Sequence, residues 1–508
     1  MGKRFILALS LSLLILLAWS ALAPKPYPVA DKEFATEKTT AAISGQRDTV
    51  IPPPVSAAIP ADLASFQYTK GQEEIVFIEQ KAAIKEVFFN GHQQYKFLLK
   101  SGLAIDDGTL VFKKTGGLEN EIRFVQSDQY KKITKAFTSL NASKYDFCLD
   151  IKVQNISTDT ITVDFPVIVG VLDFSTNSLN NRYLGVAVKT KEKNFYPNGR
   201  KETSYDDVNF VALRDRYFCL LVEPESKPCS VLIRRLNSKE SEVVLSVGKI
   251  VLSPGQQIGQ KYHIYLGPQE LGIMNSINAS WSAVINYGFF DFISQILLQL
   301  LRFFYGLVHN WGWAIIILSV VVYLALFPLT LKQMRSMKEM QTLQPHIEEL
   351  RKTYKDNPQK LNKEIMELYK QHKVNPFGGC LPLLLQMPIF FGLYQALMRS
   401  VALKGANFLW IKDLSEPDRL FILAKSLPVL GNEINILPII MAIGMFFQQK
   451  MSMVSAGGSS AEQQRIMMII FPVMFGFIFY HMPSGLVLYW LINSTLMTIY
   501  QFRAKHSK

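Results

Sequence analysis

Residues that could carry out covalent chemistry are few and scattered in this chain of 508 residues. The histidines His263, His309 and His481 have no partners at the spacing that catalysis needs. No GxSxG, HExxH or P-loop pattern occurs, so acyl transfer, zinc-dependent hydrolysis and nucleotide binding have no candidate residues. The carboxylates are dispersed, as expected for a solvated surface. The sequence therefore predicts a protein that is not an enzyme, with no catalytic residue, metal site or cofactor.

The four cysteines are Cys148, Cys219, Cys229 and Cys380. None belongs to a CxxC pair, and no His/Cys cluster has the spacing of a metal site. Cys219 and Cys229 could form a disulfide if their domain faces an oxidising compartment. Isolated buried thiols are the favoured alternative, because cysteine commonly behaves as a small buried hydrophobe.

Apolar residues are placed unevenly along the chain, which has a mean hydropathy of +0.14. Residues 62–270 have the composition of a soluble domain, whereas residues 311–502 contain repeated apolar runs long enough to cross about 30 Å of hydrocarbon. The net charge is +13, but the lysines and arginines flank the apolar runs instead of forming one basic face. This pattern indicates cytoplasmic flanks beside anionic lipids. We expect no nucleic-acid substrate.

The N-terminal residues 1–23 resemble a signal sequence, with Lys3 and Arg4 before an apolar run. Pro24 stands where a proline should hinder cleavage, and the run is near spanning length. We therefore predict an uncleaved signal-anchor helix; a cleaved signal peptide is the alternative. Residues 24–61 are rich in Pro, Ala, Ser and Thr, which predicts a disordered tether on the exported side of the membrane.

Residues 62–270 carry the signal of β-strands. Short apolar stretches are separated by turn-prone pieces, and no long stretch has helical periodicity. The clearest stretches are residues 74–79, 161–171, 208–222 and 242–252. A large antiparallel β-sandwich is the predicted class.

The segment 288–309 is nearly all apolar, yet it is not predicted to span the membrane. Asp291, Gln295, Gln299 and Arg302 give a helix here a weak polar edge. Only His309-Asn310 separates its apolar run, residues 289–308, from the next one. An extra crossing would also place the basic region after Thr330 outside the cell. We predict an amphipathic helix in the membrane–water interface.

Five further spans are predicted within residues 311–502. Residues 332–373 hold ten Lys/Arg against six Asp/Glu, a net charge of +4, and residues 503–508 form a basic tail, so both belong in the cytoplasm. With the N-terminal anchor, this gives six spans with both termini cytoplasmic. The five predicted spans are residues 311–331, 378–398, 435–449, 466–481 and 486–502.

The cytoplasmic segment 332–373 predicts a helical hairpin. One helical stripe of apolar residues is formed by Leu343, Ile347, Leu350 and Tyr354. The segment Asp356-Asn357-Pro358 ends that helix and caps the next one. A second stripe follows at Leu361, Ile365 and Leu368. More than forty residues is long for a mere connector. A mobile element that contacts substrate, lipid or ribosome and a solvated connector are equally favoured by these residues alone.

Several motifs in residues 311–502 strongly resemble those of the YidC/Oxa-type membrane protein insertases, and they occur in family order. The N-terminal anchor and the large exported domain are similar to the Gram-negative YidC form, a match that rests on architecture. The motifs are FPLT at 327–330, LQP at 343–345, KVNPFGGCLP at 373–382, QMPIF at 386–390, FLWIKDL at 408–414 and MPSGLVLYW at 482–490.

The resemblance implies a multi-domain protein of the inner membrane: a six-span α-helical protein, made of the anchor and a five-helix insertase core, with an all-β periplasmic supersandwich domain. It implies a hydrophilic groove inside the membrane that receives nascent membrane proteins without a nucleotide. The implied partners are these substrates, membrane lipids, components of the Sec translocon, and a ribosome contacted through the cytoplasmic hairpin and tail.

The resemblance also points to residues of the groove. The family commonly has an arginine in the middle of the span before the PLT motif, but the corresponding residue here is Tyr323, with Ser319 one turn earlier. We expect the groove to be wetted by hydroxyl and amide groups without a fixed charge, so that it favours acidic exported tails less than an arginine-bearing relative does. The other implied groove residues are Gln386, Tyr489, Trp490 and Asn493.

A second class of function is a secondary transporter or channel, which also has uncharged spans with scattered polar groups. Such proteins usually show inverted repeats or broken helices around an ion site. The sequence has no evident internal repeat, so the insertase is favoured. Gln386 and Asn493 also have an ordinary alternative role in helix–helix hydrogen bonding.

Overall fold

The computed structural model describes residues 64–92, 94–107, 110–116, 120–140, 144–175, 183–286, 288–355, 357–372, 381–427, 431–452 and 459–506. The chain divides into two compact units, Met1–Gly288 and Phe289–Lys508. The predicted signal anchor, the tether and most of the motif at 373–382 lie outside the described residues.

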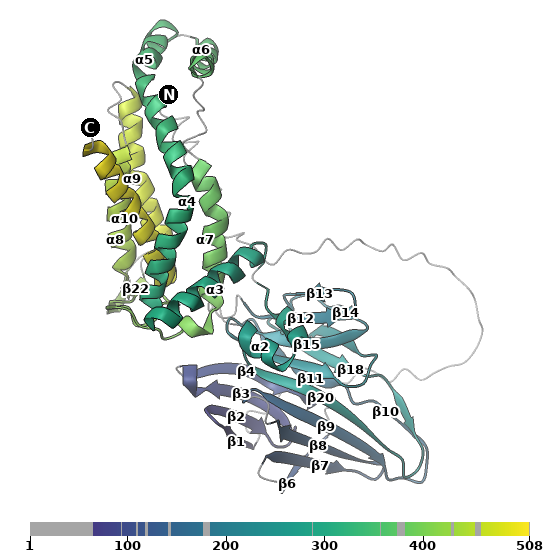
Figure 1. The fold of residues 1–508 in the computed structure, drawn as a ribbon. Coiled ribbons are helices and arrows are strands. Elements are labelled where there is room, and N and C mark those ends of the chain that lie inside the picture. Colours follow the sequence, from purple (N-terminus) through teal and green to yellow (C-terminus); the bar gives the residue numbers. More distant parts are fainter. Residues whose placement is uncertain are drawn as a thin grey trace, which may run out of the picture. The chain divides into compact units, whose positions relative to one another are not determined.

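The first unit is built from antiparallel strands, as the sequence predicts for residues 62–270 (Figure 1). The stretch 208–222 forms two strands of a hairpin, because Asp215 and Arg216 turn the chain. A short helix α2 (Leu271–Ile277) and the 3-10 turn η3 (Ala279–Val284) follow the last strand. The strands are β1 (Ser65–Lys70), β2 (Glu73–Ile78), β3 (Ala83–Phe89), β4 (Tyr95–Gly102), β5 (Ala104–Ile105), β6 (Lys113–Thr115), β7 (Glu121–Ser127), β8 (Lys131–Ser139), β9 (Asp146–Asn155), β10 (Ile161–Val163), β11 (Val167–Asp173), β12 (Gly185–Thr190), β13 (Asn194–Phe195), β14 (Thr203–Tyr205), β15 (Val208–Arg214), β16 (Phe218–Pro224), β17 (Ser230–Arg235), β18 (Glu240–Ser246), β19 (Ile250–Leu252) and β20 (Gln257–Pro268).

The sheets pack face to face around an aromatic and aliphatic core. A nine-stranded sheet has the order β13-β12-β15-β16-β20-β9-β8-β7-β6, and smaller sheets have the orders β1-β2-β3-β4 and β14-β17-β18-β11-β5. Phe77 of β2 meets Phe137 of β8 with ring centroids 5.2 Å apart, and Phe89 of β3 stacks on Phe218 of β16. Burial of these rings from two sheets gives the sandwich its stability.

Lys135 ties the layers together from inside this core. The side chain is fully buried, and its Nζ donates to the carbonyl oxygen of Ala82 at 2.6 Å and to that of Leu103. Burial lowers the pKa of the Lys135 ammonium to about 7. Ala82 and Leu103 both have positive φ, so the amine holds two tight backbone turns against β8.

The cysteines of the described residues, Cys148, Cys219 and Cys229, are free. Cys219 and Cys229 are both buried, and the Cys229 thiol donates to the carbonyl oxygen of Ser226 at 3.1 Å. The favoured alternative of isolated buried thiols is therefore confirmed for this pair.

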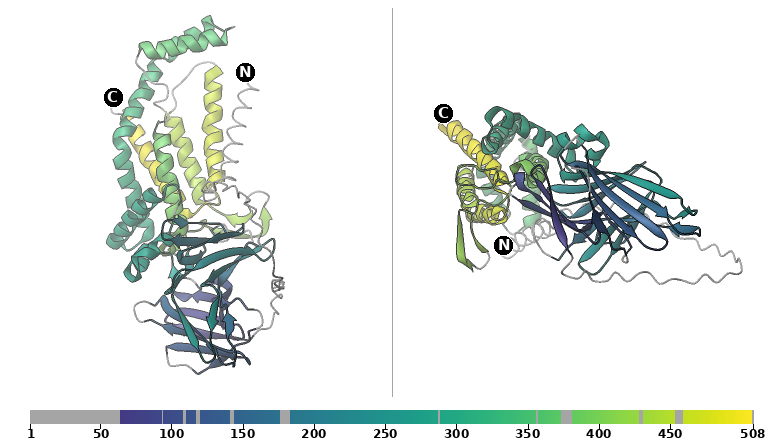
Figure 2. Two further views of the ribbon diagram at one scale, coloured as in Figure 1. Left: turned by 90° about the vertical axis from the view of Figure 1, so that its right-hand side faces the viewer. Right: turned by 90° about the horizontal axis from the view of Figure 1, so that it is seen from below.

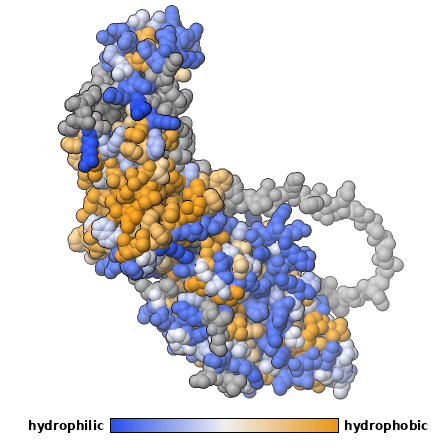
Figure 3. All heavy atoms as spheres, in the orientation of Figure 1, coloured by the Kyte–Doolittle hydropathy of each residue, from blue (hydrophilic) through white to orange (hydrophobic). Residues whose placement is uncertain are grey.

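The second unit is a helical bundle with an apolar outer surface (Figures 1 and 3). Its core is formed by apolar residues such as Leu318, Leu397, Met441 and Leu486, drawn from four helices. The elements are α3 (Asp291–Val308), α4 (Trp311–Thr342), α5 (Gln344–Thr353), α6 (Pro358–Gln371), α7 (Leu381–Arg399), η5 (Val401–Leu403), β21 (Phe421–Leu427), β22 (Gly431–Ile434), α8 (Leu437–Ser452), α9 (Ser459–Phe479) and α10 (Ser484–His506).

Helix α3 runs obliquely across the end of the bundle, at a steep angle to α4 (Figure 1). It ends at His309, which has a left-handed backbone, and α4 begins two residues later. Leu297, Leu298 and Leu301 are buried against the bundle, whereas Phe292 and Phe303 are mostly exposed. A helix with two apolar faces therefore covers one end of α4.

Three of the long helices contain an interior proline: Pro328 in α4, Pro388 in α7 and Pro472 in α9. Each proline lacks the N–H that would bond the carbonyl four residues earlier. The hydrogen-bond ladder of each helix is thus interrupted once within its apolar part.

Helices α5 and α6 follow the predicted stripes. Leu343 and Ile347 are buried, and Ile365, Leu368 and Tyr369 pack against them. The Asn357 side chain caps α6 by accepting from the backbone N–H of Lys360 at 3.0 Å, with Pro358 in the first turn. The break predicted at Asn357-Pro358 is therefore confirmed.

Candidate functional site

The six predicted groove residues lie on helices α4, α7 and α10, which contact one another in the bundle. Ser319 and Tyr323 belong to α4, and Gln386 belongs to α7. Tyr489, Trp490 and Asn493 belong to α10. The apolar parts of these three helices carry polar groups at only a few places.

A hydrogen bond joins α7 to α10 at the centre of this set. The Gln386 amide donates to the Tyr489 hydroxyl at 2.7 Å, between residues 103 apart in sequence. The Asn493 amide donates to the Tyr489 carbonyl at 2.8 Å. Tyr489 is fully buried, whereas Gln386 and Asn493 are half-buried. The three side chains form one polar cluster.

Trp490 lies beside this cluster among aromatic rings. Its ring centroid is 5.4 Å from those of Phe390 and Phe479 and 5.6 Å from that of Phe475. It is half-buried. The indole is thus packed between α7 and α9. Trp490 is next to the polar cluster in the chain, because it follows Tyr489.

The two α4 hydroxyls differ in their surroundings. Ser319 is fully buried, and its Oγ donates to the Ile315 carbonyl at 2.7 Å, one turn back in the same helix. The Tyr323 hydroxyl oxygen is also buried, but it has no hydrogen-bond partner among the residues that the structure describes. The Tyr323 ring lies 5.8 Å from Phe327, which contacts Tyr500 of α10. An unpaired buried hydroxyl is costly unless something polar pairs with it.

The side chains gathered here are hydroxyls and amides, which form hydrogen bonds. Among the described residues, no group of three or more His, Cys, Asp or Glu side chains could hold a metal ion. Hydroxyls and amides inside an apolar bundle can donate and accept hydrogen bonds to a peptide or to water.

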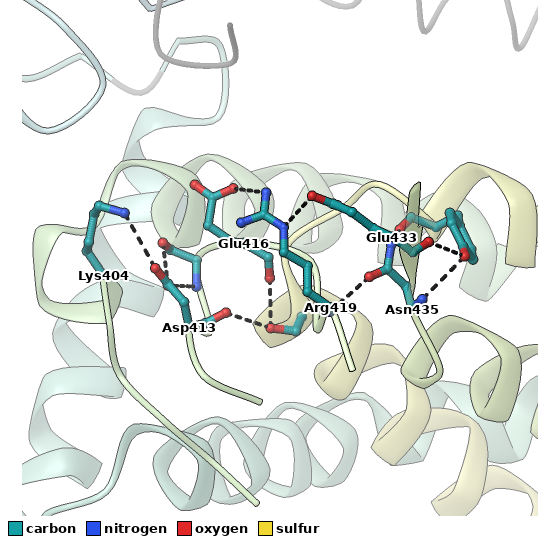
Figure 4. A network of polar contacts seen from close by, with 9 residues as sticks. Lys404, Asp413, Glu416, Arg419, Glu433 and Asn435 are labelled. Carbon is teal, nitrogen blue, oxygen red and sulfur yellow. Dashed lines mark hydrogen bonds and ion pairs between the residues drawn. The ribbon is translucent and has the colours of Figure 1, made fainter. Parts of the chain in front are cut away.

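A second polar region, absent from our sequence predictions, lies at the end of the bundle that bears β21 and β22 (Figure 4). We call it the end network. It joins the α7–α8 connection to the turn between α9 and α10, and it comprises Lys404, Asp413, Ser415, Glu416, Arg419, Glu433, Asn435, Tyr480 and Ser484.

Two residues bridge the segments of the end network. The Ser484 hydroxyl donates to the carbonyl oxygens of Asp413 and Glu416, which lie 3.0 and 2.9 Å from its Oγ. The Asn435 side-chain N–H donates to the Tyr480 carbonyl at 2.8 Å, and the Asn435 side-chain oxygen accepts from the backbone N–H of Arg419 at 2.9 Å. Ser484 and Asn435 are buried, so these bonds are shielded from water.

Asp418 fixes the start of α8 beside this network. One carboxylate oxygen accepts from the backbone N–H groups of Ile436 and Leu437 at 2.9 and 3.0 Å and from the Trp410 indole at 3.2 Å. A carboxylate at a helix N-terminus is favourable because it pairs free N–H groups and opposes the helix dipole. Trp410 and Asp413 belong to the FLWIKDL motif, which was identified from the sequence. Asp418 lies after that motif, and no sequence pattern indicated that it would cap α8.

Two described helices are long and apolar enough to cross a membrane by length and composition: Asp291–Val308, and Trp311–Lys332 within α4. The segment Met468–Phe479 is a shorter apolar helix. The first of these is α3, which the sequence predicts to lie in the interface. The six-span count stays a prediction.

Comparison with known proteins gives matches along the whole chain. One family model, described as 60Kd inner membrane protein, matches residues 303–508, and the YidC periplasmic domain model matches residues 81–300. A membrane protein insertase YidC of Pelobacter propionicus is 31% identical, over 98% of this chain and 97% of that protein. The chain belongs to the YidC family of membrane protein insertases.

Other YidC proteins give the same result. The membrane protein insertase YidC of Geobacter metallireducens is 31% identical over 99% of this chain and 98% of its own. An active YidC insertase crystal structure is 21% identical, covers 90% of this chain and 95% of its own, and has a TM-score of 0.41. The predicted resemblance, and the predicted class of a large β domain followed by a helical membrane core, are confirmed.

Proposed function

We propose that this chain inserts transmembrane segments of nascent proteins into the inner membrane, and helps them fold, through a groove lined by α4, α7 and α10. The observation that carries the proposal is the polar cluster of Gln386, Tyr489 and Asn493, with the unpaired Tyr323 hydroxyl, inside the helical unit of a YidC-family protein. The groove residues are Ser319, Tyr323, Gln386, Tyr489, Trp490 and Asn493.

The physical basis is partial solvation of a polar segment. A peptide group without a hydrogen-bond partner costs several kcal/mol in hydrocarbon. Hydroxyls and amides in the groove reduce this cost while the segment crosses. The apolar helix that follows then enters lipid, which releases about 25 cal/mol for each Å² of apolar surface buried. No nucleotide or enzymatic step is needed.

The proposed topology follows the positive-inside rule. The domain at 62–270 is periplasmic, the hairpin at 332–373 is cytoplasmic, and both termini are cytoplasmic, with six spans. The oblique course of α3 and its exposed Phe292 and Phe303 support an interfacial position for that helix. The end network then lies on the periplasmic side, where its buried hydrogen bonds close the groove.

The proposed partners are nascent membrane proteins and membrane lipids. Sec translocon components are a further proposed partner, and the protein acts alone or beside them. The basic faces of α5 and α6, with Arg351, Lys352 and Lys370 near their C-termini, suit contact with a ribosome.

Reconstitution into liposomes tests the function. We expect the purified full-length chain to insert a small coat-protein-like substrate without ATP, measured by protease protection. The Gln386→Leu variant should insert less, whereas Thr495→Val, which changes an exposed hydroxyl on α10, should match the unmodified chain. Solute flux without insertion would instead indicate a transporter and would contradict the proposal.

A further inference from the structure

The hairpin formed by β21 and β22 stands out from the side of the helical bundle in both views of Figure 2. Phe421 and Ile422, at the start of β21, are 61% and 69% exposed. Adjacent residues of a strand point to opposite faces. The hairpin therefore exposes a large apolar side chain on each of its two faces.

The base of this hairpin is fixed, although the hairpin itself is uncovered. The Leu420 N–H donates to the Ile434 carbonyl at 3.0 Å, and Arg419 Nε lies 2.8 Å from a carboxylate oxygen of Glu433. Among the described elements, the two strands mainly contact one another. A lone two-stranded hairpin is marginally stable in water, so it needs a surrounding that favours its apolar residues.

The hairpin is continuous with the lipid-facing side of the bundle. Helix α8 begins three residues after β22, and its exposed residues Ile439, Ile440, Ile443 and Phe447 form one apolar stripe. In a membrane protein of this family, such a stripe faces hydrocarbon. The exposed Phe421 and Ile422 thus lie close in sequence to the point where the lipid-facing stripe starts.

Two arguments identify what surrounds the hairpin. A protein partner or a second copy would cover one face, whereas lipid can surround both Phe421 and Ile422. Each strand also has one edge without a partner strand in the described sheet. Because unpaired backbone groups are too costly in hydrocarbon, the hairpin cannot lie in the hydrocarbon core. The headgroup–acyl boundary satisfies both conditions, because it combines apolar chains with water and polar headgroups.

We propose that the β21–β22 hairpin is a membrane-interface anchor, with Phe421 and Ile422 inserted among phospholipids at the headgroup–acyl boundary. Because its base carries Arg419 and Glu433 of the end network, the anchor holds that network at a fixed depth. This inference rests on the membrane placement proposed above.

Photocrosslinking in liposomes of phosphatidylethanolamine and phosphatidylglycerol tests the anchor. The full-length chain carries p-benzoylphenylalanine in place of Phe421, Ile422, Phe447 or Val251, one at a time. Phe447 on the α8 stripe is the lipid control, and Val251, which is 62% exposed in the β unit, is the water control. The readout is the mass added to the intact protein on illumination.

We expect phospholipid adducts at positions 421 and 422 at a yield similar to that at 447 and several-fold above that at 251. Adducts to a second copy, or a yield as low as that at 251 while 447 labels well, would overturn the anchor and leave the insertase proposal intact. Absence of lipid adducts at 447 as well would overturn the membrane placement on which both rest.

Discussion

The two polar regions of the helical unit differ in how completely their groups are paired. At the end network, Ser484 and Asn435 each form two hydrogen bonds that join separate segments. In the middle of the bundle, the Gln386–Tyr489 bond joins two helices, and the Tyr323 hydroxyl has no partner in the described part of the chain. We expect the many bonds between segments to make one region rigid, and the few bonds of the other to leave it able to pair with the passing peptide proposed above. Substitutions in the two regions should therefore have different consequences.

The largest expected effect is that of Asp418→Ala at the rigid end. It leaves two backbone N–H groups and the Trp410 indole without their acceptor, which should lower the free energy of unfolding by about 3 kcal/mol. Thermal unfolding in detergent measures this. Asp418→Asn is the matched control, since it keeps one acceptor oxygen and should lose clearly less. Equal stability of the Ala variant and the unmodified chain would mean that this carboxylate does not hold α8.

Gly312→Ala tests the packing of α4 against the same end. A methyl group at Gly312 would lie 2.1 Å from ring atoms of Phe408, in the α7–α8 connection, so one of the two must move. We expect a loss of about 2 kcal/mol in stability, which the same melting experiment detects. Gly306→Ala in α3 is the control, because nothing lies within 4 Å of its added methyl group. If both variants melt alike, α4 is not packed tightly there.

In the middle of the bundle, a double-mutant cycle on Gln386→Leu and Tyr489→Phe should give a coupling energy of only about 1 kcal/mol. Stability of the single and double variants, measured by unfolding in mixed detergent, supplies the four values. Each single variant should reduce insertion more than it reduces stability. A coupling energy as large as the Asp418 effect would remove the distinction between the two regions.

Tyr323→Phe should cost no stability and should raise it by at most about 1 kcal/mol, because the buried hydroxyl that it removes has no partner among the described residues. Its effect should appear in function: insertion of small substrates with neutral and with acidic exported tails should both fall. Tyr323→Arg should raise insertion of the acidic-tailed substrate relative to the neutral one. Unchanged insertion of both substrates by the Phe variant would exclude this hydroxyl from the mechanism.

Much of the fold could be predicted, because the hydropathy of a segment and the spacing of its apolar residues determine most helices and strands. The apolar run at 311–331 became α4, and the turn signal Asn357-Pro358 separated α5 from α6. The hairpin at 421–434 lies between the predicted spans 378–398 and 435–449, where no element was predicted from the sequence. Its apolar stretch from Phe421, bounded by Pro428 and Gly431, is the signal that could have indicated it.

The sequence could predict which residues belong to the candidate site, but not how they contact one another. Family motifs indicated Gln386 and Tyr489, but no sequence spacing predicts that side chains 103 residues apart form a hydrogen bond. The difference between Ser319 and Tyr323 is also a property of packing. A serine in an apolar helix can bond the carbonyl one turn back, whereas the longer tyrosine places its hydroxyl beyond its own backbone.

The interior prolines of α4, α7 and α9 have a mechanical consequence. A helix with a missing backbone bond bends more readily at that point than elsewhere. Helices α4, α7 and α9 thus each contain one point of easier bending within the apolar part of the bundle. Bending at these prolines can make room for an incoming segment while the ends of the helices keep their positions.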